Sequence, residues 1–325
     1  MAATTGAVAK DPVLVGRSPA FGRVMELIDK VSRCDVSVLI QGETGTGKEL
    51  AARAIHYSGS RRDAPFVPIN CGAIPDALVE SELFGHVRGA FTDAREGRAG
   101  MVAQAEGGTL FLDEIEAMSV HAQVASLRFL QSLEYRPVGA SAVLRANVRI
   151  VAASNIDLTE LAGQGGFRSD LLFRLNVFVI EMPPLRARGE DIIDLAENLV
   201  DRLCSRYGKP RMTLSEEYRD HLRCHSWPGN VRELENALHR KVLLCEGSVL
   251  RCDDSPGCFS SSGSIAAPAA RVMAFREAKA HAIAEFERAY LAELLKRTAG
   301  NVSHAARMCG QERSRLNKLV RKHGL

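Results

Sequence analysis

The segment Gly42–Lys48, which reads Gly-Glu-Thr-Gly-Thr-Gly-Lys, constrains the fold of this chain more than any other feature. It follows the apolar run Val36–Ile40 and leads into a stretch with helical pattern, Glu49–Tyr57. A strand, a glycine loop and a helix in this order are typical of a phosphate-binding loop, because the backbone N–H groups and the helix dipole both attract an anion. We therefore predict that Lys48 reaches the β- and γ-phosphates of a nucleotide. A chance glycine turn is the alternative.

A second motif places two carboxylates at the end of another predicted strand. Residues 107–114 read Gly-Gly-Thr-Leu-Phe-Leu-Asp-Glu. Asp113 is expected to hold Mg²⁺, mostly through water, and Glu114 to polarise the attacking water as a general base. A pair of helix N-cap residues is the alternative. Because Glu49 rather than Ser or Thr follows Lys48, Asp113 and ordered water must supply more of the metal coordination.

Short apolar runs alternate with helix-like segments from Val13 to about Ala153, which predicts an α/β fold with a parallel sheet covered on both faces. The glycine loop falls at the carboxyl end of its strand, where such sheets bind ligands. The predicted strands are Val36–Ile40, Phe66–Ile69, Thr109–Leu112 and Val148–Ala153. After Pro183 and Pro184 the strands are expected to stop. Three amphipathic helices should follow, at Asp191–Tyr207, Ser215–His225 and Asn230–Cys245.

The chain divides on these patterns into five parts. They are a lead-in (1–12), an α/β subdomain (13–184), a helical lid (185–253), a linker rich in small residues and proline (254–270), and a C-terminal helical domain (271–325). The last part carries a charge of +7, although the whole chain carries only +3, so residues 1–270 carry −4. A basic end on a mildly acidic body indicates a polyanion-binding domain.

The eight cysteines are scattered, and none forms a C-x-x-C pair. We therefore expect reduced thiols in a cytosol and a cytoplasmic protein. Cys245, Cys252 and Cys258 are the closest group, for which a metal or redox role is the less favoured alternative. No apolar run approaches the length of a membrane span, and Met1–Lys10 lacks the apolar core of a signal peptide.

Together these motifs resemble the AAA+ ATPases that activate transcription by sigma-54 RNA polymerase, the bacterial enhancer-binding proteins. The resemblance covers about residues 13–250, with a second match at the C-terminus. An acidic residue after the lysine, here Glu49, is usual in that family. The resemblance implies ATP and Mg²⁺ as cofactors. It implies a nucleotide-binding loop made of Gly42, Glu43, Thr44, Gly45, Thr46, Gly47, Lys48 and Glu49.

Other candidate residues of the nucleotide site also come from this resemblance. Asn70 matches the asparagine that pairs with the catalytic glutamate and holds Glu114 aside. Asn155, after Ser154 in place of the usual threonine, matches the sensor of the γ-phosphate, with a plain Asx turn at the strand end as the alternative. Arg232 falls on the second sensor, which reports nucleotide state to the lid. Val15-Gly16 resembles the segment that covers the adenine.

Arg168 and Arg174 match the pair that the family offers to the ATP of a neighbouring subunit. A guanidinium there neutralises charge that develops on the transferred phosphoryl group. If both lie on one helix, six residues apart, they point about 120° away from each other. The resemblance implies a ring, expected to be a hexamer, with each active site shared between subunits. The alternative is an ordinary solvated charge pair.

The segment Glu82–Ala94 resembles the loop that contacts sigma-54, whose usual core reads Gly-Ala-Phe-Thr-Gly-Ala. This chain keeps Phe91 and Thr92, the expected contacts, but has Asp93 at the second glycine. A surface loop whose Phe91 folds back onto the body is the alternative. Tyr135–Ala146 occupies the place of the family's second insertion, and we expect a hairpin or loop that moves with the first.

Residues Phe286–Leu325 resemble a Fis-type helix-turn-helix, with Glu312–Lys322 as the recognition helix. Arginine and asparagine can read base edges, while other cations contact phosphates. Such modules usually dimerise on palindromic sites. A solvated basic helix face is the alternative. The expected DNA contacts are Arg313, Ser314, Arg315, Asn317, Lys318, Arg321 and Lys322.

The function that the resemblance implies is an ATP-hydrolysing activator. It would bind upstream DNA, assemble a ring and drive the Phe91 loop against sigma-54 to open the promoter. The first alternative is a sigma-54-independent DNA-binding regulator that uses its ATPase module as an oligomerisation switch, which Asp93 favours. A chaperone-like AAA+ protein is a third hypothesis, and the C-terminal DNA module argues against it. We expect no receiver domain before the ATPase, and control by a partner protein or by expression level; a truncated form of a longer protein is the alternative.

Overall fold

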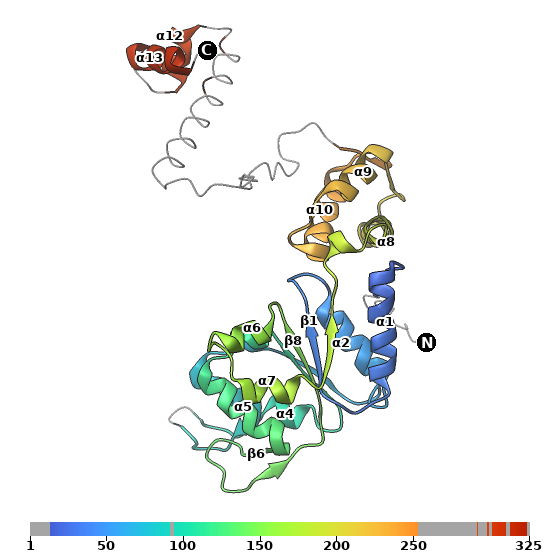
Figure 1. The fold of residues 1–325 in the computed structure, drawn as a ribbon, viewed down its shortest axis with the longest axis vertical. Coiled ribbons are helices and arrows are strands. Elements are labelled where there is room, and N and C mark those ends of the chain that lie inside the picture. The colour runs from blue at the N-terminus through green and yellow to red at the C-terminus, as the bar shows by residue number, and fades with distance from the viewer. Residues whose placement is uncertain are drawn as a thin grey trace, which may run out of the picture. The chain divides into compact units, whose positions relative to one another are not determined.

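The structure is a computed structural model that describes residues 14–91, 94–252, 291, 298, 301–309 and 313–323 (Figure 1). The chain forms two compact units, Met1–Asp254 and Ser255–Leu325. The predicted lead-in and the predicted linker lie outside the described residues.

The predicted parallel sheet forms the centre of the first unit and has five strands. Its strands run in the order β2-β5-β8-β1-β9, so β1, the first strand in the chain, lies inside the sheet between β8 and β9. The bounds are β1 Val38–Gln41, β2 Phe66–Asn70, β5 Thr109–Asp113, β8 Arg149–Ser154 and β9 Phe178–Glu181. Four strands were expected within a residue or two. The edge strand β9 was not, although its run Phe-Val-Ile carries the same β-branched signal.

Side chains from successive strand positions enter two different cores, which is why the strands are apolar throughout. In β1, Val38 and Ile40 join the core beneath α1 (Pro19–Ser32) and α2 (Lys48–Tyr57), whereas Leu39 joins the opposite core. Each face of the sheet is therefore covered by helices. The helices and short turns on the opposite side and at its margins are η1 Cys71–Ala73, η2 Asp76–Leu78, α3 Val79–Phe84, α4 Met101–Gln104, η3 Ile115–Ala117, α5 Val120–Ser132, α6 Leu158–Gly163 and α7 Ser169–Leu175.

Two short antiparallel hairpins interrupt this α/β pattern. The first pairs β3 (Gly85–His86) with β4 (Arg98–Ala99), and the second pairs β6 (Glu134–Tyr135) with β7 (Leu144–Arg145). The second hairpin occupies the segment for which a hairpin or loop was predicted.

The lid follows the turn η4 (Leu185–Ala187) and has its own apolar core around Trp227. Its helices, α8 Asp191–Tyr207, α9 Glu216–Cys224 and α10 Asn230–Leu244, match the three predicted ones. Helix α9 begins one residue late because Ser215 is its N-cap and accepts a hydrogen bond from Tyr218 N. The expectation that strands stop at Pro184 is wrong, since β10 (Thr213–Leu214) pairs in parallel with β11 (Val249–Leu250).

In the second unit, α12 (Val302–Met308) and α13 (Arg313–His323) share a small core with Leu291. Asn301 caps α12, its side chain accepting a hydrogen bond from His304 N at 3.1 Å. Ala305 and Ala306 are buried, and such small side chains let the two helices approach closely.

None of the described helices is both long and apolar enough to cross a membrane. The seven cysteines in the described part of the chain form no disulfide, and Cys258 lies outside it. No group of three metal-ligating side chains occurs among the described residues, Cys245 and Cys252 included.

Candidate functional site

The glycine loop lies between β1 and α2, at the carboxyl end of the sheet. Gly45 and Gly47 have φ values of 81° and 97°, where a side chain would be strained. A Cβ on Gly45 would also lie 2.3 Å from Gly229 O of the lid. Gly47 caps α2 without any side-chain hydrogen bond, so the first-turn N–H groups of this helix stay available to an anion.

Lys48 begins α2, and its ammonium group is surrounded by oxygen acceptors. Its Nζ donates to Gly42 O at 2.7 Å, to Glu43 O at 3.0 Å and to Asn155 Oδ1 at 2.7 Å. Burial lowers the pKa of Lys48, and the nearby Asp113 carboxylate works in the opposite direction. The lysine is thus a buried donor at the mouth of the glycine loop, as phosphate binding requires.

Asp113 and Glu114 follow one another at the end of β5. Burial raises the pKa of Asp113, although its Oδ1 accepts a hydrogen bond from Glu114 N at 3.0 Å. Glu114 has a left-handed φ of 52°, which turns it away from the strand direction. Its Oε2 accepts a hydrogen bond from Asn70 Nδ2 at 3.1 Å, the pairing that the family resemblance implies. Two carboxylates beside a lysine form a donor set that suits Mg²⁺ with several waters.

Asn155, at the end of β8, lies between Lys48 and a residue that our sequence reasoning missed. Its backbone N and its Nδ2 both donate to Glu116 Oε1, at 3.1 and 2.8 Å. The Ser154 hydroxyl, by contrast, donates to Ile156 O and closes the turn. The signal for Glu116 in the sequence is only its position two residues after Glu114. Its role depends on the adjacency of β5 and β8.

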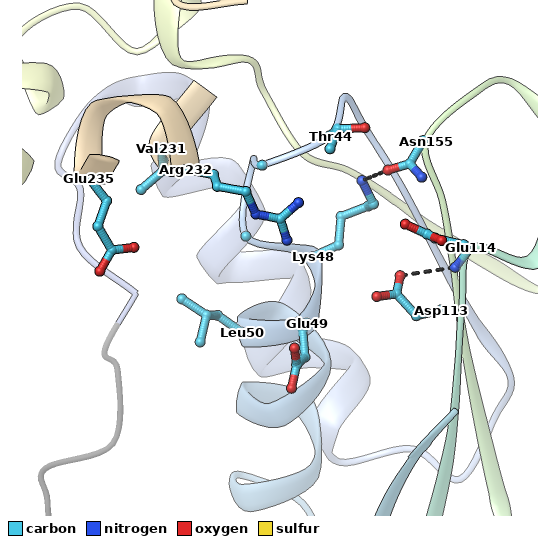
Figure 2. A pocket seen from close by; sticks show the side chains of 12 residues that line it. Thr44, Lys48, Glu49, Leu50, Asp113, Glu114, Asn155, Val231, Arg232 and Glu235 are labelled. Carbon is cyan, nitrogen blue, oxygen red and sulfur yellow. Dashed lines mark hydrogen bonds between the residues drawn. The ribbon is translucent and has the colours of Figure 1, made fainter. Parts of the chain in front are cut away.

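The lid completes the site from the other side. Arg232, in the first turn of α10, points toward the glycine loop and Lys48 (Figure 2). A cavity of about 220 Å³ lies between these elements. Its lining residues are Thr44, Gly45, Gly47, Lys48, Glu49, Leu50, Asp113, Glu114, Asn155, Val231, Arg232 and Glu235. The predicted site residues are thus largely brought together.

Four predicted nucleotide-binding residues do not line this cavity: Gly42, Glu43, Thr46 and Asn70. Glu43 instead faces the lid and is held by both amino groups of Arg186, at 2.8 and 2.5 Å, and by Asn230 Nδ2 at 3.1 Å. Arg186 and Asn230 lower the pKa of Glu43 to about 2. The Thr46 hydroxyl donates to Glu43 O at 2.8 Å, so it shapes the loop from inside.

The segment before α1 is anchored to the lid by the buried Asp191. This carboxylate accepts hydrogen bonds from Arg17 N at 2.6 Å and from the Ser18 hydroxyl at 2.7 Å. Arg188 also contacts Asp191 and donates to Val15 O. The role of Val15 in covering an adenine stays a prediction.

Arg168 and Arg174 do not share one helix. Arg168 is the extended N-cap residue of α7, and Arg174 lies in its last turn, so the predicted 120° separation does not apply. Arg168 pairs with Asp170 at 2.7 Å, and Arg174 donates to Gln131 O at 2.9 Å. Neither arginine lines the cavity beside Lys48.

The Phe91 loop, Glu82–Ala94, is hydrogen-bonded to the second insertion, Tyr135–Ala146. Val87 N donates to Val138 O at 3.1 Å, and Val138 N donates to Gly85 O at 2.8 Å. The Phe91 ring lies 4.9 Å from the His86 ring and is 41% exposed, so it partly folds back while keeping an open edge. Thr92 and Asp93 lie outside the described residues.

On α13, one face is buried through Leu316 and Val320. The predicted DNA-binding residues Arg313, Asn317, Lys318 and Lys322 are exposed on the remainder of this helix. The side chains of Ser314, Arg315 and Arg321 lie outside the described part of the structure.

Three family models match the chain in succession. They are the sigma-54 interaction domain over residues 14–181, the AAA+ ATPase lid domain over residues 186–271, and the Fis family of bacterial regulatory proteins over residues 282–319. The first of these alone spans half of the chain.

Known proteins are similar over nearly all of its length. The transcriptional regulatory protein FlbD of Caulobacter vibrioides is 42% identical over 95% of this chain and 70% of its own. GlrR of Escherichia coli is 44% identical, with 96% and 68% covered. The crystal structure of NtrX from Brucella abortus in complex with ATP has a TM-score of 0.74 at 33% identity, covering 98% of this chain and 70% of NtrX. The chain therefore belongs to the sigma-54-dependent transcriptional activators, with an AAA+ P-loop domain, its lid and a Fis-type helix-turn-helix.

Proposed function

We propose that this chain hydrolyses ATP in the cavity between the glycine loop and the lid. Lys48 and the first-turn N–H groups of α2 bind the phosphates, and Arg232 contacts them from the lid. Mg²⁺, when bound, neutralises phosphate charge, and Asp113 is the carboxylate that holds it. Glu114 accepts the proton of the attacking water. The ATP-bound and ADP-bound structures of NtrX support nucleotide binding at this fold.

The catalytic unit in this proposal is a ring, expected to be a hexamer. Arg168 and Arg174 serve the active site of the neighbouring subunit, where a guanidinium stabilises the transferred phosphoryl group. Two observations support this assignment. Both arginines lie outside the cavity formed by their own chain, and their present partners, Asp170 and the Gln131 carbonyl, lie in exposed positions.

Hydrolysis is coupled to motion of the Phe91 loop through Asn70. The Asn70 amide donates to Glu114 with its Nδ2, and its Oδ1 accepts a hydrogen bond from Ala73 N at 3.1 Å, capping η1. From η1 the chain runs through η2 and α3 into β3, the first strand of the loop hairpin. A change in the contact between Glu114 and Asn70 therefore acts on the N-cap of η1, where the path to the Phe91 loop begins. The second hairpin moves with the loop because the two are hydrogen-bonded.

The moving loops act on sigma-54, with Phe91 and Thr92 as the contacts, and so convert the closed promoter complex to the open one. The C-terminal domain, residues 271–325, binds palindromic upstream DNA as a dimer through α13. The other divisions follow the predicted bounds: 13–184 for the α/β subdomain, 185–253 for the lid and 254–270 for the linker. The protein acts in the cytoplasm, where a partner protein can regulate it.

One alternative keeps the DNA-binding and ATP-binding parts but removes the contact with sigma-54. Asp93 favours it, because this residue adds one negative charge per subunit to the loop and restricts a backbone position that is usually glycine. In that case the ATPase module would serve only as an oligomerisation switch.

The observation that carries the proposal is the convergence of Lys48, Asp113, Glu114 and Arg232 on one cavity. The test is open-complex formation by sigma-54 RNA polymerase on a promoter with an upstream binding site. We expect opening with ATP, and none with a non-hydrolysable analogue or with the Phe91→Ala protein. Opening without hydrolysis, or no opening while the protein is bound to its site, contradicts the proposal.

Sharing of sites between subunits has its own control. Lys48→Ala and Arg168→Ala proteins should each be inactive alone. Mixing them should restore part of the ATPase activity, because some interfaces then combine an intact Lys48 with an intact Arg168. A mixture without any activity contradicts the shared site.

A further inference from the structure

The Asn155 side chain lies between two charged groups that fix which way its amide points. Lys48 Nζ donates to Asn155 Oδ1 at 2.7 Å, and Asn155 Nδ2 donates to Glu116 Oε1 at 2.8 Å. An ammonium group can only donate and a carboxylate can only accept. The amide oxygen must therefore face Lys48, and the NH₂ group must face Glu116. Reversing the amide would break both hydrogen bonds.

Glu116 holds Asn155 by its main chain as well. The same Oε1 accepts a hydrogen bond from Asn155 N at 3.1 Å, so the acceptor is fixed relative to the end of β8. The parallel pairing of Leu112 with Ala152 explains the approach, because it brings the turn after β5 beside the end of β8. The other carboxylate oxygen, Glu116 Oε2, is buried and has no hydrogen-bond partner among the described residues. The carboxylate is thus held through one oxygen only.

The three N–H donors of Lys48 are all directed at protein oxygens. Two acceptors, Gly42 O and Glu43 O, belong to the glycine loop itself. The third, Asn155 Oδ1, comes from a different strand and depends on Glu116 for its orientation. A phosphate that engages Lys48 must therefore compete with an acceptor that Glu116 keeps in place.

We propose that Glu116 is a positioning residue that keeps the Asn155 oxygen on Lys48 and so opposes engagement of a triphosphate. The inference rests on the proposed nucleotide site. Once Lys48 transfers to a phosphate, the Asn155 oxygen faces an anion. If the amide turns so that NH₂ faces the γ-phosphate, its oxygen meets Glu116 Oε1 instead. In the first orientation the Asn155 oxygen faces the phosphate, and in the second it faces Glu116 Oε1. Two acceptors therefore meet in either case, so Glu116 weakens the interaction of Asn155 with the γ-phosphate.

The test is the affinity for a non-hydrolysable ATP analogue and for ADP, measured with Mg²⁺ by titration calorimetry. In the Glu116→Ala protein the Asn155 amide is free to turn. We expect the analogue to bind about three- to tenfold more tightly, the range of one ordinary hydrogen bond, and ADP to change less. Glu116→Asp should also tighten binding of the analogue, because the shorter side chain withdraws the acceptor but keeps the charge.

Glu116→Gln separates orientation from charge. The Asn155 N–H group holds the new amide oxygen at the former Oε1 position, so this variant loses the charge but keeps the acceptor. We expect it to bind the analogue more weakly than Glu116→Ala does. Equal tightening by Gln and Ala, with Asp unchanged, would overturn the proposal in favour of simple charge repulsion.

The Asn155→Ala background supplies the second control. Adding Glu116→Ala to it should leave the affinity unchanged, and a persisting effect would overturn the proposal. Weaker binding by both Glu116→Ala and Glu116→Asp would also overturn it. If the wild-type protein binds neither nucleotide, the proposed function itself fails, which is a different result from any of these.

Discussion

Asn230 joins the glycine loop to the lid, and its replacement should destabilise the lid strongly. The residue is fully buried and has a left-handed φ of 52°. Its Nδ2 donates to Thr44 O at 3.0 Å and to Glu43 Oε2 at 3.1 Å. Its Oδ1 accepts from Leu185 N at 2.8 Å, in the turn that leads into the lid. One amide therefore ties together three segments that are far apart in the sequence.

The structure sets the size of the effect. Asn230→Gly keeps the left-handed backbone but leaves the buried Leu185 N–H without its acceptor, which costs roughly 1–3 kcal/mol. Adding about 1 kcal/mol for the loss of the donated bonds, we expect the free energy of unfolding to fall by about 2–4 kcal/mol. Asn230→Ala loses the same bonds and must also hold a left-handed conformation, for about 1–2 kcal/mol more.

The assay is urea unfolding followed by tryptophan fluorescence. Trp227 is the only tryptophan of the chain and is 3% exposed in the lid core, so its emission reports on this subdomain. Asn198→Ala is the matched control, because Asn198 is an exposed asparagine on α8 of the same lid; we expect a change within about 0.5 kcal/mol. Equal unfolding midpoints for Asn230→Ala and the wild type would refute the reasoning. Equal unfolding midpoints for Asn230→Ala and Asn230→Gly would refute the additional cost assigned to the left-handed backbone.

Three further predictions concern other parts of the chain. Glu114→Gln should still bind ATP but lose turnover, because the proton acceptor is gone while the phosphate contacts remain; unchanged hydrolysis in a coupled assay would remove Glu114 from the mechanism. Burial lowers the pKa of His56 below its ordinary 6.5, so the unfolded chain takes up the proton more readily than the folded chain. The free energy of unfolding should therefore fall as the pH drops below about 6.5, by at most about 1.4 kcal/mol per pH unit. The fall should be smaller in His56→Gln when unfolding is compared between pH 7.5 and 5.5, and an identical slope would exclude His56. Lys318→Ala should weaken DNA binding at all sequences and reduce the slope of log affinity against log salt by about one, without changing ATP turnover.

The strands that carry the site could be predicted from the sequence, because each is a short apolar or β-branched run that ends at a polar residue. Periodicity also placed helices such as Asp191–Tyr207 correctly. The edge strand β9 carries the same signal but lies beyond Ala153, where the predicted alternation of strands and helices ends. The two-residue pair β10 and β11 could not be predicted, since two residues show no periodicity and their pairing joins distant parts of the lid.

Within the site, sequence reasoning failed where a contact depends on strand order. Glu116 meets Asn155 only because β8 lies beside β5, and no spacing in the chain reveals that adjacency. The same limit hid the contacts of Glu43 and Asn230, which are 187 residues apart in the sequence. The predicted angle of 120° between Arg168 and Arg174 assumes that both residues are helical, but Arg168 precedes its helix. A one-residue shift of the helix start invalidates such an argument, because the N-cap has extended rather than helical backbone angles.

The charged groups assigned to phosphate chemistry differ in how firmly the chain holds them, and this difference separates binding from catalysis. Arg168 pairs with Asp170 where their side chains are 43% and 45% exposed, and water screens such a pair so that it exchanges partners easily. Lys48 is only 6% exposed and gives all its donors to partly buried oxygens, where water screens the contact less than it does at an exposed pair. A triphosphate must therefore compete chiefly for Lys48, and the affinity is determined at the glycine loop. An arginine such as Arg168, which exchanges its partner readily, adds little to the affinity for ATP. We therefore expect it to act mainly by stabilising the transition state.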